Sequence, residues 1–301
     1  MYAENDEPLK EYTLCLTGTS GYIGQHLLNV LKEKGYTFRQ IGRSKIQDQQ
    51  ALTSNEIVWS NIDELRQKIT VLNKPILINI AGYFVGKHQA HDIEALCEGN
   101  IKFPLQMYEA FAKAGCKEIL NIGTSWEYDS MGKRNPENLY AALKTANANL
   151  LDWFSREYSI KVINLKLNDT YGGNDTRKKL LPLLKKARNE GSKLELGYGS
   201  QEINLLNIED VCEGIISALR ALILQKANAQ CDMFLLSDET VTLSKLIEIS
   251  NEVSEKKIEV SFRYASDENG NLRSVWREAP LVPNWRPKVK LKNGLRKYYE
   301  S

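Results

Sequence analysis

Residues 17–24 read Thr-Gly-Thr-Ser-Gly-Tyr-Ile-Gly, a glycine-rich turn whose flanking segments indicate the class of fold. An apolar run at residues 12–16 precedes it, and apolar residues at helical spacing follow it. A strand, a glycine turn and an amphipathic helix in this order are typical of a dinucleotide-binding unit. Gly18 would permit the tight turn, Gly21 would let the backbone approach a pyrophosphate, and Gly24 would let helix pack on strand.

The glycine spacing is Gly-x-x-Gly-x-x-Gly, which differs from the commonest fingerprint, but the physical requirements are the same. The first amides of the helix and its positive dipole end favour an anionic group. The turn could also be purely structural, but its flanking elements favour a cofactor site. The residues expected to bind the cofactor here are Gly18, Ser20, Gly21, Tyr22, Ile23 and Gly24.

The rest of the N-terminal half alternates short apolar runs with helical patterns, which predicts an α/β fold with a doubly wound parallel sheet. Strands are expected at residues 38–41, 56–59, 75–81, 118–122 and 161–167, and helices at 63–69, 100–114 and 140–158. We expect a Rossmann-type domain at residues 1–168, with later segments at about 204–236 returning to its sheet. Residues 169–301 are expected to form mainly a smaller cap.

Composition narrows the class of protein. The chain has 301 residues, 42% of them hydrophobic, and a net charge of +2, which gives no strong field for nucleic acid or membrane surfaces. The five cysteines are scattered, the first ten residues are polar, and no apolar run approaches the ~20 residues of a membrane span. We expect a cytoplasmic protein with no membrane or nucleic-acid partner. His88 and His91 have no evident third ligand, so no metal is expected.

The end of the second expected strand selects between the two nicotinamide cofactors. An NAD enzyme carries an acid there for the ribose hydroxyls, whereas this chain carries Arg43 and Ser44. An arginine can bind a phosphate in a bidentate manner, and a serine hydroxyl adds a donor. We therefore favour NADP(H) over NAD(H); the alternative is that Arg43 is a solvated loop charge.

Tyr140 and Lys144 lie four residues apart on an expected helix, so both side chains share one face. A nearby cation favours ionisation of a phenol, which suits proton transfer to or from a carbonyl oxygen. Thr124 and Ser125 follow an expected strand at the carboxyl edge, where open α/β sheets bind ligands. A hydroxyl there could hold the reacting oxygen.

With these motifs the chain resembles the extended short-chain dehydrogenase/reductase family, in its nucleotide-sugar epimerase, dehydratase and reductase branch. The matching segments are residues 17–24, 79–82, Asn100, Thr124 with Tyr128, Tyr140 with Lys144, 171–172, 207–211 and 284–288. The resemblance implies a Rossmann-type doubly wound parallel sheet with a smaller C-terminal substrate-binding cap, and a homodimer.

The resemblance also implies roles for individual residues. Tyr140 would be the acid/base, Lys144 would lower its pKa and hold the nicotinamide ribose, and Thr124 would orient the substrate, with Ser125 as the alternative. Further cofactor contacts are implied for Asn61, Ile62, Ala81, Gly82 and Asn100.

Within this branch, the 4,6-dehydratases carry an Asp-Glu pair after the threonine, whereas this chain has Ser125 and Trp126, with Glu127 one position late. Epimerases hold NAD tightly with an acid after the second strand, and Arg43 argues against that. We therefore expect an NADPH-dependent reductase of a nucleotide-linked keto-deoxysugar, similar to the deoxysugar 4-ketoreductases. The alternatives are an NAD-dependent nucleotide-sugar epimerase and a non-catalytic NADP-binding module.

Two positions depart from the family pattern for binding a diphosphate. Ile203 stands where many members have an arginine, and Asp169 stands where they often have an asparagine. A carboxylate there would repel a diphosphate. Arg177, Lys178 and Lys179 could supply the missing positive charge, as could Arg263 or Arg273; the alternative is that they are a solvated helix start. The residues expected to face the substrate are Ser125, Trp126, Asp169 and Arg177.

Overall fold

Seven strands form one parallel sheet in the computed structural model, which describes residues 7–42, 55–224, 230–263 and 274–300. The strands are β1 (Thr13–Thr17), β2 (Phe38–Gly42), β3 (Glu56–Val58), β4 (Pro75–Asn79), β5 (Glu118–Thr124), β6 (Lys161–Leu167) and β10 (Gln230–Leu235). Their order is β10-β6-β5-β4-β1-β2-β3, so the winding direction reverses between β1 and β4. Ligands of open α/β sheets bind in the crevice at such a reversal.

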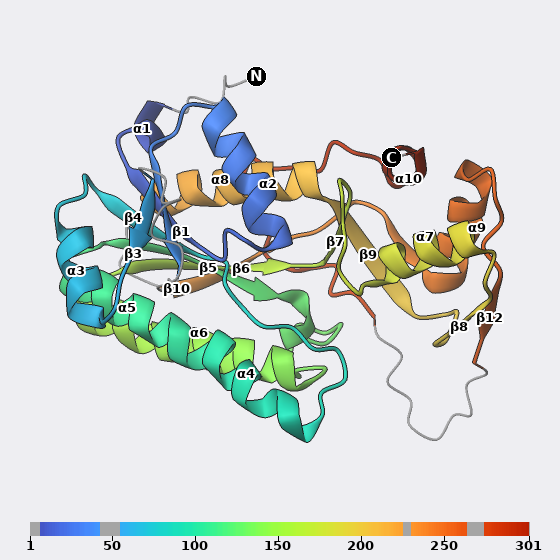
Figure 1. The fold of residues 1–301 in the computed structure, drawn as a ribbon, viewed down its shortest axis with the longest axis horizontal. Helices are drawn as coiled ribbons and strands as arrows, with labels where there is room; N and C mark the ends of the chain where they lie inside the picture. Colours follow the sequence, from blue (N-terminus) through green and yellow to red (C-terminus); the bar gives the residue numbers. More distant parts are fainter. Residues whose placement is uncertain (1–6, 43–54, 225–229, 264–273, 301) are drawn as a thin grey trace.

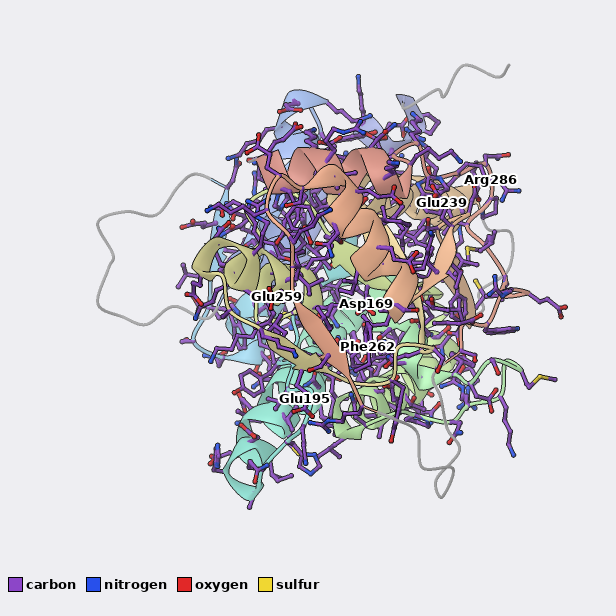
Figure 2. All side chains as sticks on the ribbon, turned by 90° about the vertical axis from the view of Figure 1, so that its right-hand side faces the viewer. Asp169, Glu195, Glu239, Glu259, Phe262 and Arg286 are labelled. Atoms are coloured by element: carbon purple, nitrogen blue, oxygen red, sulfur yellow. The ribbon has the colours of Figure 1, made fainter. Side chains whose placement is uncertain are left out.

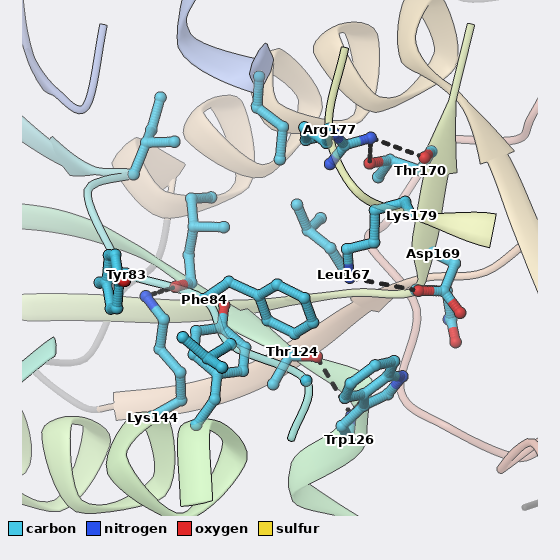
Figure 3. Close-up of a pocket in the computed structure, with 18 of the residues that line it drawn as sticks. Tyr83, Phe84, Thr124, Trp126, Lys144, Leu167, Asp169, Thr170, Arg177 and Lys179 are labelled. Atoms are coloured by element: carbon cyan, nitrogen blue, oxygen red, sulfur yellow. Dashed lines mark hydrogen bonds and ion pairs between the residues drawn. The ribbon is translucent and has the colours of Figure 1, made fainter. Parts of the chain in front are cut away.

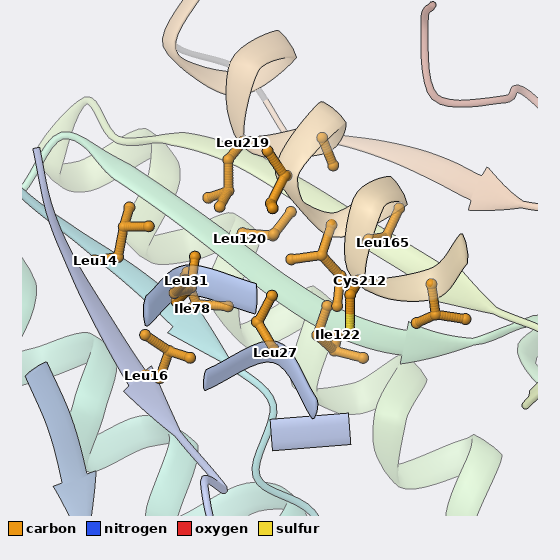
Figure 4. Close-up of a cluster of buried hydrophobic side chains, with 14 of the residues drawn as sticks. Leu14, Leu16, Leu27, Leu31, Ile78, Leu120, Ile122, Leu165, Cys212 and Leu219 are labelled. Atoms are coloured by element: carbon orange, nitrogen blue, oxygen red, sulfur yellow. The ribbon is translucent and has the colours of Figure 1, made fainter. Parts of the chain in front are cut away.

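Helices cover both faces of this sheet (Figure 1). On one face lie α2 (Tyr22–Glu33) and α8 (Ile208–Leu224), with α1 (Glu7–Lys10) packed against α8; on the other lie α3 (Ile62–Thr70), α5 (Phe103–Lys113) and α6 (Leu139–Tyr158). Alternate residues of each strand point to opposite faces. Leu14 and Leu16 thus pack with α2 and α8 (Figure 4), whereas Cys15 packs with the opposite helices. The predicted doubly wound parallel sheet is confirmed.

A row of buried polar side chains crosses the middle of the sheet. Thr17, Asn79, Asn121 and Asn164 are register partners on four adjacent strands. Thr17 Oγ1 donates to Asn79 Oδ1 at 3.0 Å, and each amide donates to the next at 2.9 Å. Tyr108 bonds to Asn79 and Asn121 and donates to Asn147 of α6, so this asparagine ladder joins β1 to α6.

Within its described residues, the C-terminal part has two small sheets of its own. They are β11-β9-β7 and β12-β8, formed by β7 (Asp169–Tyr171), β8 (Leu194–Leu196), β9 (Glu202–Asn207), β11 (Thr240–Thr242) and β12 (Val260–Phe262). The helices here are α7 (Leu180–Glu190), α9 (Leu243–Val253) and α10 (Leu291–Glu300). Figure 2 looks onto this part, with Glu195 of β8 and Phe262 of β12 on neighbouring strands.

Of the segment at about 204–236 that was expected to return to the main sheet, β10 pairs with β6, whereas β9 pairs within the smaller sheet because it lies between β7 and β11. A separate apolar core, including Leu184, Leu205 and Leu246, fills the C-terminal part. The two parts meet where β6 leads through Asn168 into β7.

The C-terminal segment at residues 284–288 is fastened to α8. Trp285 Nε1 donates to the backbone carbonyl of Asp210, and the Asp210 carboxylate accepts from the backbone amides of Lys288 and Val289 at 2.9 and 3.0 Å. Two motifs that lie far apart in the sequence, 207–211 and 284–288, are therefore one structural unit.

Candidate active site

The glycine turn leaves the start of α2 open to a ligand. Gly21 occupies the N-cap position without a side-chain cap, so amides of the first turn have no side-chain acceptor there. Gly18 has φ +71, and a Cβ at this position would lie 2.7 Å from the amide nitrogen of Ala81. A Cβ on Gly24 would lie 2.7 Å from the Cα of Thr19. Both positions require glycine, and the exposed amides suit a pyrophosphate.

A cavity of about 620 Å³ lies over this turn. Its lining residues include all the predicted contacts of the turn and also Ala81 and Gly82: Gly18, Thr19, Ser20, Gly21, Tyr22, Ile23, Gly24, Ile41, Gly42, Ile80, Ala81, Gly82, Tyr83, Ala95, Glu98, Gly99, Phe103 and Arg177. Its size, glycine floor and open helix start fit a dinucleotide.

The other predicted cofactor residues lie elsewhere. Arg43 and Ser44 fall outside the described residues. Asn61 caps the start of α3, and neither it nor Ile62 is among the described lining residues of the cavity. Asn100 is fully buried behind the cavity and donates to the carbonyls of Tyr83 and Leu96.

A second cavity has a volume of about 640 Å³, and Figure 3 shows residues that line it. It is lined by Ile23, Ile80, Tyr83, Phe84, Val85, Gly86, Ile122, Gly123, Thr124, Trp126, Tyr140, Lys144, Leu167, Asn168, Asp169, Thr170, Arg177, Lys178 and Lys179. Four residues line both cavities: Ile23, Ile80, Tyr83 and Arg177. The two cavities therefore share a wall, and a dinucleotide in one would reach the other.

Thr124, Tyr140 and Lys144 all line this second cavity. Thr124 is the last residue of β5, and its Oγ1 accepts from the amide of Trp126 at 3.3 Å. Tyr140 and Lys144 lie in the first two turns of α6, which Asn138 caps. The Tyr140 ring packs edge-on against Phe84. Lys144 Nζ donates to the Ile122 carbonyl at 3.1 Å and lies 5.9 Å from the Tyr140 ring centre.

Burial is the largest cause of the pKa shifts of Tyr140 and Lys144. Desolvation lowers the pKa of Lys144 to about 8, against a smaller raising effect of Glu127 and with a further lowering by Lys166. Desolvation, with Glu127 next, raises the pKa of Tyr140. Lys144 is not among the causes of this shift, which are the loss of water and the Glu127 carboxylate.

The residues expected to face the substrate line two different cavities. Trp126 and Asp169 line the second cavity, and Asp169 lies 3.9 Å from Lys179 Nζ. Ser125 instead lines a small neighbouring cavity, and its buried Oγ has no hydrogen-bond partner among the described residues.

Arg177 lies on the shared wall and is already engaged by protein groups. It donates through Nε and Nη2 to Asp175 at 2.8 Å, and its guanidinium stacks 3.8 Å from the centre of the Tyr22 ring. Its charge is thus balanced in part by Asp175, and it faces the cofactor cavity as well as the substrate cavity.

Two further residues line the second cavity: Lys179, which was named with Arg177 and Lys178 as a source of positive charge, and Phe84, which was not predicted. Lys179 Nζ lies 3.6 Å from the centre of the Phe84 ring and 4.9 Å from that of Trp126, so an aromatic pair holds the ammonium at the cavity wall. The basic run at residues 177–179 is a sequence signal for Lys179. Phe84 has no such signal, because only the course of the chain after β4 brings it to Tyr140.

The described residues contain no group of three or more His, Cys, Asp or Glu side chains that could hold a metal ion. Among the same residues, no helix is both long and apolar enough to cross a membrane.

A Rossmann-type sheet whose glycine turn adjoins a threonine, a tyrosine and a lysine defines the class of nicotinamide-dependent oxidoreductases and epimerases. The chain belongs to the NAD dependent epimerase/dehydratase family, whose family model matches residues 14–228.

Similar proteins indicate the type of enzyme within this family. The chain is 31% identical over 260 residues to a CDP-abequose synthase of Yersinia pseudotuberculosis, a match that covers 85% of this chain and 89% of the relative. It is 23% identical over 310 residues to a dTDP-4-dehydro-6-deoxyglucose reductase of Escherichia coli, which covers 95% and 96% of the two chains. These relatives support an enzyme of the nucleotide-sugar reductase or epimerase type.

The solved structures agree on the fold. MoeE5, solved in complex with UDP-glucuronic acid and NAD, superposes with a TM-score of 0.78 at 17% identity and covers 96% of this chain and 98% of its own. The UDP-glucose 4-epimerase of Thermotoga maritima superposes with a TM-score of 0.75 at 19% identity, with coverage of 96% and 97%.

Proposed function

We propose that the protein is an NADPH-dependent reductase of a nucleotide-linked keto-deoxysugar. The observation that carries this proposal is the shared wall between the glycine-floored cavity and the cavity lined by Thr124, Tyr140 and Lys144. A carbonyl compound in the second cavity would lie beside the reactive end of a dinucleotide in the first. The similarity to a CDP-abequose synthase and to a deoxyglucose reductase supports a deoxysugar substrate.

When bound, the nicotinamide supplies the hydride that reduces the carbonyl carbon. The protein supplies the proton: the Tyr140 hydroxyl donates it to the carbonyl oxygen, and burial keeps this phenol protonated until it reacts. Thr124 Oγ1 donates a hydrogen bond to the same oxygen and fixes its direction. Lys144, which is held by the carbonyl of Ile122, favours the tyrosinate that the transfer leaves behind.

Dehydration of the sugar is disfavoured by the residues after Thr124. Ser125 lies in the neighbouring small cavity, and Trp126 presents an indole to the substrate cavity. Neither group can supply the extra acid and base that eliminate water. Glu127 is fully buried and lines neither cavity among their described residues, so it does not replace them.

The preference for NADP(H) over NAD(H) rests on Arg43 and Ser44, which follow β2 in the sequence. A guanidinium and a hydroxyl suit the 2′-phosphate of NADP(H). We expect NADPH to bind more tightly than NADH when both are titrated against the purified protein. Tightly bound, stoichiometric NAD in the purified protein would instead favour the epimerase alternative.

The substrate contacts proposed here are Trp126, Asp169 and Arg177, together with Ser125, which lines the neighbouring small cavity. Asp169 would repel a diphosphate on its own, but Lys179 lies 3.9 Å from its carboxylate and offsets its charge. Lys178 and Lys179 both line the cavity and are the lysines from which the diphosphate would gain positive charge.

The proposal also includes a cytoplasmic homodimer and a division between a cofactor domain at residues 1–168 and a cap. On α6, Leu150 and Trp153 are exposed, the indole to 50%. Large apolar side chains exposed together on a helix suit an interface between copies. Sedimentation of the purified protein at twice the monomer mass of 34.3 kDa is the expected result.

The decisive test replaces the proposed acid. The Tyr140→Phe variant should lose turnover of nucleotide-linked ketosugars by about 10²–10⁴-fold while its affinity for NADPH stays nearly unchanged, because only the proton donor is removed. Turnover is measured by loss of nicotinamide absorbance across a panel of such sugars. Tyr158→Phe, at the far end of the same helix, is the matched control and should react like wild type.

Wild-type turnover in Tyr140→Phe would contradict the assignment of the acid. Absence of turnover by the wild-type protein with every ketosugar, together with tight NADPH binding, would favour the non-catalytic module instead.

A further inference from the structure

Glu127 and Lys166 form an ion pair that is buried beneath the candidate active site. Lys166 Nζ lies 2.6 Å from Glu127 Oε2, and both side chains are 0% exposed. Neither residue is among the described lining residues of the two large cavities. Two charges removed from water need good compensating contacts, so the position of this pair calls for a physical reason.

The contacts of Glu127 join four elements. Its Oε1 accepts from the backbone amide of Thr124 at 3.0 Å and so closes a capping box around the short 3₁₀ turn η4 (Ser125–Glu127). Its Oε2 accepts from Lys166 of β6 and, at 3.5 Å, from Thr145 of α6. One carboxylate therefore ties the end of β5 to the turn, to the next strand and to the helix that carries Tyr140.

The end of β5 is fitted to this arrangement. A Cβ on Gly123 would lie 2.6 Å from Glu127 Oε1 and 2.8 Å from Lys166 Cδ, so only glycine leaves room for the pair. The preceding residue, Ile122, accepts from Lys144 through its carbonyl. In three consecutive residues of β5, the Ile122 carbonyl accepts from Lys144, Gly123 leaves room for the buried pair, and Thr124 lines the substrate cavity.

We infer that Glu127 and Lys166 are positioning residues, which hold Thr124 and Lys144 in their active geometry without touching substrate or cofactor. The inference takes the catalytic roles of Thr124 and Lys144 from the proposed function. The contacts are specific: the carboxylate reaches the amide of Thr124 and the hydroxyl of Thr145, the residue next to Lys144, and the Lys166 ammonium neutralises it.

The charges around the pair are balanced. Lys166 Nζ also lies 3.9 Å from Asp232 of β10, and Asp232 is bonded to the Tyr128 hydroxyl and to Arg134. The cluster around Lys166 therefore contains two acids, Glu127 and Asp232, and two bases, the buried Lys166 and the exposed Arg134. Tyr140 faces Lys144 from the same helix, and the pair formed by Asp169 and Lys179 lies at the cavity wall.

Glu127 and Lys166 act on Lys144 in opposite directions: the carboxylate raises the Lys144 pKa, and the buried ammonium lowers it. Loss of one partner should therefore shift the titration of Lys144 one way, and loss of both should restore it in part. Loosened packing alone would admit water and raise the Lys144 pKa in every variant, so shifts of opposite sign require a fold that keeps both charges in place.

The test compares Glu127→Gln, Lys166→Met and the double variant. The readout is the titration of Lys144, followed through the ε-carbon NMR signal of labelled lysine that disappears in Lys144→Met. We expect the Lys144 pKa to fall by about one unit in Glu127→Gln and to rise by less in Lys166→Met, because Glu127 has the larger effect. In the double variant it should lie between the wild-type value and that of Glu127→Gln.

This readout needs no turnover, so its failure is distinguishable from failure of the proposed function. The alkaline limb of the pH profile of kcat should move in the same directions if both hold. Should Lys166→Met not fold, Glu127→Gln and the double variant still decide, because the first must shift the titration and the second must restore it in part. Equal titration of Lys144 in wild type and Glu127→Gln, or a shift that the double variant retains in full, would overturn the inference.

Discussion

The two large cavities differ in the part of the chain that lines them. The cofactor cavity has a floor of backbone, formed by one continuous turn and by residues 80–83. The substrate cavity is walled by side chains, among them Phe84, Trp126 and Lys179, that come from separate segments of the chain. Backbone amides are fixed by the fold, so they suit a pyrophosphate that stays the same, whereas side chains can change with the substrate while the fold is retained.

The strongest test of this difference adds one methyl group to the glycine turn of the cofactor cavity. In Gly24→Ala the new Cβ would lie 2.7 Å from the Cα of Thr19, and the turn must distort to admit it. Because such overpacking costs about 1–3 kcal/mol, we expect NADPH affinity to fall by up to about 100-fold, measured by fluorescence titration. Gly86→Ala is the control, since its Cβ would meet no described atom closer than 3.8 Å. Unchanged affinity in Gly24→Ala would show that the floor does not depend on its backbone.

A side-chain wall should behave in the opposite way. Trp126→Ala removes the indole that faces Lys179 and Phe84. We expect the KM for the sugar to rise by about 10- to 30-fold and the affinity for NADPH to change by less than about twofold, because hot-spot aromatic residues contribute about 2 kcal/mol. Steady-state kinetics and cofactor titration measure the two effects. Tyr198→Ala, at an exposed aromatic residue between β8 and β9, should leave both quantities unaltered.

The smallest effect is expected on the shared wall. Arg177→Lys keeps the charge but loses the two-pronged contact with Asp175 and the stacking on Tyr22. We expect losses of about threefold to fivefold in the affinities for both sugar and NADPH, as for a partly exposed charged contact. A loss confined to one ligand would assign Arg177 to that cavity alone.

The sequence predicts the local features of the fold and of the site better than the contacts between distant segments. The glycine turn, the strands of the N-terminal half and the pairing of Tyr140 with Lys144 depend on local spacing, which the sequence displays directly. The substrate wall depends on contacts between distant segments. Phe84 reaches Tyr140 through an irregular loop that leaves no periodic pattern.

Glu127 illustrates the same limit within a recognised motif. Its place after Thr124 indicates only an acid one position late for a dehydratase. Its burial against Lys166 could not be read from spacing, because the partner arrives from β6, 39 positions further along the chain. The raising of the Tyr140 pKa by burial could not be read from spacing for a related reason: the sequence shows the neighbouring cation but not the loss of water.

The asparagine ladder across the sheet has a consequence for assembly. Because strand side chains alternate between the two faces, a slip of one residue in β4 or β5 would turn its amide away from its partners and leave buried donors unpaired. Misaligned pairings are therefore penalised at several strands together. The ladder begins at Thr17, directly before Gly18, and ends at Asn147, one helical turn beyond Lys144. A chain that pairs its strands in the wrong alignment would thus also fail to bring its two chemical centres together, so the same amides discriminate against inactive folds.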